Sequence, residues 1–175
     1  MEIKTIFLGL LALLLTACGV NVTLSTDTER VVGASAKIAD FNLPAGYYAD
    51  FRTDVMGYEV AAYTRGDGPS HIYLIQSDNE SDGEKLAQVL DELFIGSGDP
   101  QTRMTVIENR SVSVRGQENI LVISEAVNSE GLSYRQAAVG FPGNGGPALL
   151  VFSESIENWD YAILNDLLAS LEIIE

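Results

Sequence analysis

The second half of the chain carries the pattern that most constrains the fold. Beyond Pro100, β-branched and other apolar residues recur in short runs that are typical of β-strands. The runs cover residues 104–107, 111–114, 119–123, 134–141 and 148–152. The segments between them are too short to contain the crossover helix that parallel strands need. We therefore expect consecutive strands to pair as an antiparallel sheet.

The first half adds a hairpin to this sheet. Residues 58–63 and 71–75 are rich in aromatic and β-branched side chains, and the turn sequence Arg65-Gly66-Asp67-Gly68-Pro69 separates them. The Asp-Gly step supplies the positive φ of a tight hairpin turn. In residues 41–47, apolar and polar residues alternate up to a proline, which suggests a short edge strand.

Two segments have helical periodicity. Apolar residues from Leu86 to Phe94 recur at i, i+3, i+4, i+7 and i+8, after a capping box at Ser81 and Glu84 and before Gly96. A second stripe, from Ile163 to Leu171, predicts a closing helix that begins at about Asn158. The order of elements predicts an α+β fold: an antiparallel sheet flanked by two main helices, as an α/β/α sandwich.

Charge and composition exclude several function classes. The 175 residues include 10 basic and 25 acidic side chains, so the net charge of −15 repels nucleic acid and anionic headgroups. The chain has one cysteine and one histidine. It therefore cannot form an internal disulfide framework or a multi-histidine metal cage.

The N-terminus has the pattern of an export signal. A short basic start precedes an apolar run over residues 5–15, which is too short to span a membrane comfortably. The residues that close it, Leu15-Thr16-Ala17-Cys18, resemble the lipobox of bacterial lipoproteins. That resemblance implies that residues 1–17 are removed and that Cys18 is lipidated. The alternative is an ordinary secretory signal that leaves a free thiol.

The expected organisation follows from this signal. Residues 18–39 are predicted to be a polar linker, with a possible strand near residues 30–32, and residues 40–175 a single domain. The lipid would hold the domain to the cell membrane, or to an outer membrane if the host has one, outside the cytoplasm.

The predicted domain resembles the PsbP-like fold. The resemblance is carried by the opening Phe-x-Leu-Pro-x-Gly-Tyr of residues 41–47, the helix after the first hairpin, the antiparallel strands, and the closing Leu-Leu-Ala-Ser-Leu of residues 167–171. This fold occurs in a photosystem II extrinsic protein and in many small bacterial lipoproteins. Because its members share no chemistry, the resemblance implies an interaction module.

Few residues suggest a site. Tyr47, Tyr48 and Phe51 place three rings within five residues, more than one strand face can bury, so they are candidates to line a partner groove. His71 is predicted to be a strand-edge histidine. The Gly-rich residues 140–147 lead into a strand and are predicted to be a hairpin loop rather than a phosphate cradle.

An acidic cluster leaves two interpretations open. Asp78, Glu80 and Asp82 stand at alternate positions before a glycine, as in the first half of a calcium loop. The twelfth position, however, is Val89, so a true EF-hand is excluded. The cluster is either a weak cation site or an acidic entry to a helix, where it meets the positive end of the helix dipole.

The sequence therefore predicts a membrane-anchored envelope lipoprotein that acts as a non-catalytic binding or adaptor module. Its partners would be the membrane and an envelope protein, and its only prosthetic group the covalent lipid on Cys18. Two alternatives remain: an envelope hydrolase that uses carboxylates in a cleft, which requires acids buried together around a pocket, and a weak divalent-cation or solute-binding module.

Overall fold

A single eight-stranded antiparallel sheet dominates the structure. The computed structural model describes residues 23–55, 57–66, 68–77, 79, 104–128 and 131–171. The strand order is β1-β2-β3-β4-β8-β7-β6-β5. The strands are β1 (Thr23–Ser25), β2 (Tyr48–Val55), β3 (Tyr58–Thr64), β4 (His71–Ser77), β5 (Thr105–Val114), β6 (Gln117–Val127), β7 (Ser133–Pro142) and β8 (Pro147–Ser155). The helical elements are α2 (Thr28–Ile38), η3 (Ile156–Asn158) and α4 (Tyr161–Ser170).

The sheet consists of two antiparallel meanders joined at their last strands. Strands β1 to β4 follow one another, as do β5 to β8, and β4 pairs with β8 in the middle of the sheet. The predicted antiparallel pairing and the β3–β4 hairpin are confirmed. Because β8 lies between β4 and β7, it is buried on both faces, which explains its continuous apolar run.

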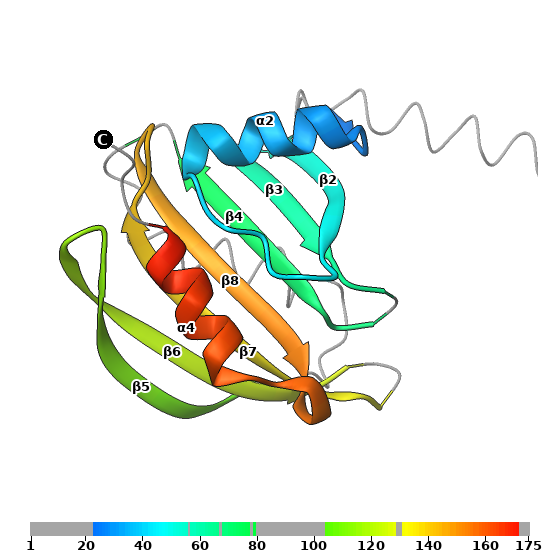
Figure 1. Cartoon of the computed structure of the whole chain (residues 1–175), viewed down its shortest axis with the longest axis vertical. Coiled ribbons are helices and arrows are strands. Elements are labelled where there is room, and N and C mark those ends of the chain that lie inside the picture. The colour runs from blue at the N-terminus through cyan, green and yellow to red at the C-terminus, as the bar shows by residue number, and fades with distance from the viewer. Residues whose placement is uncertain are drawn as a thin grey trace, which may run out of the picture.

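The two α-helices lie on the same face of this sheet (Figure 1). Val31 of α2 and Leu164 of α4 belong to one buried cluster, together with side chains of one sheet face such as Leu74, Leu150 and Phe152. The other face has a smaller cluster of Tyr58, Val60, Ile75, Leu149 and Val151. The predicted α/β/α sandwich flanked by two main helices is therefore wrong. The helix predicted over residues 81–96 lies outside the described residues.

Helix α2 replaces part of the predicted polar linker. Asp27 caps it by accepting a hydrogen bond from the backbone N–H of Arg30 at 3.0 Å. Val31, Ala34 and Ile38 are almost fully buried against the sheet. The interpretation of residues 28–38 as a linker with a possible strand is therefore wrong. The buried positions of this segment recur at helical spacing, but many of its residues are small or polar, so the pattern is weak in the sequence.

Two strand predictions also need correction. Residues 104–107 and 111–114 were expected as separate strands. Instead, residues 105–114 form the single strand β5, which has a register shift between Val106 and Glu108. The shift is typical of a β-bulge, and it breaks the alternation that would have marked one strand. Residues 41–47 form no strand, and β2 begins only at Tyr48.

The Gly-rich segment is confirmed as a hairpin loop, and it fixes α2 in place. Pro142 pairs with Pro147 across the turn. The Asn144 backbone N–H donates to the Ile38 carbonyl at 2.8 Å, and its side-chain amide donates to the Ala36 carbonyl at 3.1 Å. The C-terminal end of α2 therefore receives two hydrogen bonds from this loop.

Candidate functional site

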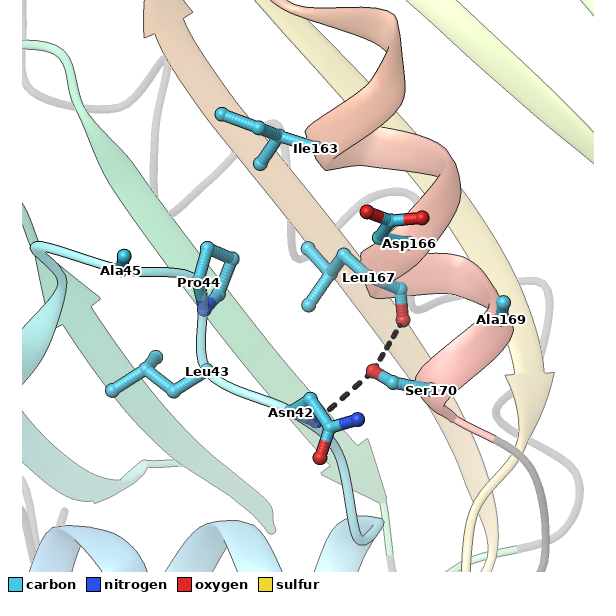
Figure 2. A pocket seen from close by; sticks show the side chains of 9 residues that line it. All are labelled: Asn42, Leu43, Pro44, Ala45, Ile163, Asp166, Leu167, Ala169 and Ser170. Carbon is cyan, nitrogen blue, oxygen red and sulfur yellow. Dashed lines mark hydrogen bonds between the residues drawn. The ribbon is translucent and has the colours of Figure 1, made fainter.

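An open groove lies between α4 and the segment that leads into β2. Its volume is about 580 Å³. It is lined by Asn42, Leu43, Pro44, Ala45, Ile163, Asp166, Leu167, Ala169 and Ser170. In Figure 2, Ile163 and Leu167 point from α4 toward the segment that carries Pro44.

The local sequence determines both walls of the groove. Asp160 caps α4 by accepting a hydrogen bond from the Ala162 backbone N–H at 2.7 Å. Leu164, Leu167 and Leu168 face the core at helical spacing, which leaves Asp166 and other residues between them exposed.

A hydrogen bond connects the two walls at one end. The Asn42 backbone N–H donates to the Ser170 hydroxyl at 3.0 Å, and that hydroxyl donates to the Leu167 carbonyl at 2.8 Å (Figure 2). This contact fixes the 42–45 segment against the end of α4 and closes one end of the groove. An open hollow whose lining combines apolar side chains with Asn42, Asp166 and Ser170 can receive a ligand or a peptide segment.

The most deeply buried charge in the described part of the chain is near this segment but outside the groove. Glu154 of β8 is 1% exposed. It accepts hydrogen bonds from the Tyr47 hydroxyl at 3.0 Å and from the Ser70 hydroxyl, and it forms an ion pair with Arg65. Burial, and then the Glu154 charge, raise the pKa of Tyr47 above its usual value. Glu154 was not among the residues predicted from the sequence, although its position two residues after Phe152, on the same face of a strand, was an available signal.

The structure separates the three predicted aromatic candidates. Tyr47 is buried on the helix-bearing face, where the Arg65 guanidinium lies 5.4 Å from its ring centroid. Tyr48 is 56% exposed. Phe51 packs against the cluster on the opposite face, with its ring centroid 6.5 Å from that of Tyr73. The three rings therefore do not form one surface.

The other predicted site residues are placed as follows. His71 begins β4, as expected, with its ring stacked at 5.5 Å on Tyr73. Cys18, Asp78, Glu80 and Asp82 lie outside the described residues. Within the described ranges, no three His, Cys, Asp or Glu side chains are grouped so that they could hold a metal ion.

A second hollow of about 610 Å³, near the C-terminal end of α2, is polar. Its charged side chains are largely paired with one another: Lys37 with Glu59 at 3.4 Å, and Arg52 with Glu59 at 3.6 Å and with Asp54. Paired charges have little need of a charged ligand. The groove along α4 is therefore the better candidate site.

Comparisons with known proteins define no family. No family model matches the chain, and no curated protein matches it. The resemblance to the PsbP-like fold therefore gains no support. A similar solved structure is LpqN of Mycobacterium tuberculosis, described as involved in cell envelope biogenesis. The two share 11% sequence identity with a TM-score of 0.35, over 89% of this chain and 83% of that one. A similarity this low supports no argument about fold or function.

Among the helices that the structure describes, none has the length and apolar character needed to cross a bilayer.

Proposed function

We propose that this protein is a lipid-anchored envelope lipoprotein that acts as a non-catalytic binding or adaptor module outside the cytoplasm, with the groove along α4 as its partner site. The anchor is supported by the sequence Leu15-Thr16-Ala17-Cys18 at the end of an apolar N-terminal run. The binding role is supported by one observation above all: an open groove of about 580 Å³ whose lining combines apolar and polar side chains.

The charge of the groove suggests the chemistry of its partner. Asp166 is the one ionisable residue in the lining, and no described residue forms an ion pair with it. The chain as a whole carries a net charge of −15. A partner segment with an apolar side chain beside a Lys or Arg would fit both the apolar walls and the carboxylate.

The hydrolase alternative needs carboxylates grouped around a cleft, and the described residues offer little support for it. Glu154 is paired with Arg65 and hydrogen-bonded to Tyr47 and Ser70, so its lone pairs are occupied. It also does not line the groove. The cation-binding alternative depends on Asp78, Glu80 and Asp82, which lie outside the described residues.

Site-specific crosslinking from the groove tests the binding role. A photoreactive residue at exposed Ala169 should crosslink one reproducible envelope protein in intact cells. The same residue at exposed Glu118, which is not in the groove lining, should not. Asp166→Asn should reduce the Ala169 crosslink by about threefold or more, the effect of losing about 0.7 kcal/mol. Equal products from both positions would contradict the groove as partner site.

A further inference from the structure

The first strand that the structure describes is very close in sequence to the proposed anchor. Residues 19–22 separate Cys18 from Thr23, the first residue of β1. Five steps along a fully extended chain span at most about 18 Å. The helix at residues 28–38 removes the longer flexible linker that the sequence suggests. A lipid on Cys18 would therefore place β1 within about 18 Å of the lipid headgroups.

This short connection restricts which part of the sheet can reach the bilayer. β1 is at one end of the strand order and β5 is at the other. Seven spacings of about 4.8 Å put these two strands roughly 34 Å apart along the sheet. That distance is about twice the reach of the connection, so the connection keeps the β1 edge near the bilayer and sets no such limit for the β5 edge.

The residues at the β1 edge have the chemistry of a membrane-contacting surface. Leu24 of β1 is 65% exposed, and Val32 of α2 is 49% exposed. Arg30, in the first turn of α2, is exposed, and no ion pair joins its side chain to another described residue. Leu24 is in register with Thr53 and Val60, so its side chain is on the sheet face opposite to α2. This edge therefore exposes an apolar side chain on one face and a guanidinium without an ion pair at the start of α2, and both kinds of group suit the headgroup region of a bilayer.

Neighbouring acids limit the electrostatic part of this contact. Asp27 and Glu29 stand on either side of Thr28 at the start of α2, and the Asp27 carboxylate is occupied as the helix cap. The local charge therefore does not favour an anionic surface. The contact depends on the anchor and on apolar burial, and it requires no anionic lipid.

We propose that the β1 edge, with Leu24 and the first turns of α2, lies against the lipid bilayer, while the β5 edge points away from it. This inference rests on the proposed lipid anchor at Cys18. It assigns a lipid surface as the partner of this edge, in addition to the protein partner of the groove.

Fluorescence quenching on vesicles tests the orientation. With Cys18 lipidated, a new cysteine is the single free thiol, because the chain contains no other cysteine. Leu24→Cys and Ile120→Cys give matched label positions, because the two native side chains are 65% and 60% exposed. Position 24 is on the edge strand β1, and position 120 is on β6, which pairs with the opposite edge strand β5. The labelled lipoproteins are placed in phosphatidylcholine vesicles that contain a headgroup-attached quencher.

We expect the label at position 24 to be quenched about threefold more than the label at position 120. Inserting 20 Gly/Ser residues after Gly19 should remove most of this difference, because such a linker adds about 25 Å of mean reach. Equal quenching at the two positions on lipidated protein would overturn the orientation and leave the anchor intact. A wild-type protein that fails to float with the vesicles, like Cys18→Ser, would overturn the anchor and this inference together.

Discussion

Glu154 is a buried carboxylate whose charge is balanced chiefly by Arg65, a side chain 30% exposed. Replacing Arg65 with Met keeps much of the apolar stem and removes the charge, which leaves a buried carboxylate without its cation. We expect Arg65→Met to lower the free energy of unfolding by about 2–4 kcal/mol in urea titrations. Arg30→Met, at an exposed position, should change it by less than about 0.5 kcal/mol. Similar small effects of both variants would show that Glu154 does not need this partner.

Tyr47 makes the stability of the fold sensitive to alkaline pH. Burial and the neighbouring Glu154 raise the pKa of Tyr47 above its usual value of about 10. The folded state therefore holds the phenolic proton more tightly than the unfolded state. The resulting stabilisation is complete below pH of about 10 and is lost as pH rises through the folded-state pKa.

Urea unfolding between pH 8 and pH 11.5 should show this loss in the wild type. Tyr47→Phe should cost about 1–2 kcal/mol at pH 8, because Glu154 loses a hydrogen bond, and it should make the alkaline decline shallower. A decline remains, because burial also raises the pKa of Tyr73. An unchanged slope in Tyr47→Phe would assign the alkaline effect to other groups.

The β7–β8 loop depends on a glycine whose neighbours leave no room for a side chain. A Cβ on Gly143 would lie 2.5 Å from Gln76 Oε1 and 2.9 Å from the Gly146 carbonyl oxygen. We expect Gly143→Ala to destabilise the protein by about 1–3 kcal/mol in thermal or urea unfolding. Gly140→Ala is the matched control, because its nearest neighbour would be the Ala148 carbonyl oxygen at 3.9 Å. Equal stability of the two variants would refute this packing argument.

The elements that the sequence predicted well are those in which one local signal dominates. The β3–β4 hairpin has the sequence Asp-Gly between two β-rich runs, and β8 is a continuous apolar run. α2 was missed because its buried face includes the small residues Ala34 and Ser35, which add little to an apolar stripe. Its burial depends on tertiary contacts, including the Ser35–Tyr63 hydroxyl hydrogen bond.

The candidate groove could not be predicted because it joins distant parts of the chain. Its walls are residues 42–45 and α4, which are more than 100 residues apart in sequence and meet through the contact of Asn42 with Ser170. Regular alternation along an extended chain would place Tyr47 and Phe51 on the same face. The register shift between Ala49 and Arg52 interrupts this alternation, so the two rings lie on opposite faces of the sheet.

At the scale of the whole molecule, we propose a domain held at a membrane, with its β1 edge near the lipid and a partner groove on its helical face. The anchor is the claim on which the location and the orientation both depend. Cys18 is also the residue whose chemistry would give the clearest signal, since lipidation would change its mass and removal of residues 1–17 would make it the new N-terminus.

The measurement that tests this claim most directly is the intact mass of the protein purified from the membranes of the cells that make it. We predict a chain of residues 18–175, with its N-terminal Cys18 carrying acyl chains, that partitions into detergent. A chain without acyl groups, recovered in the soluble fraction or still containing residues 1–17, would contradict the account.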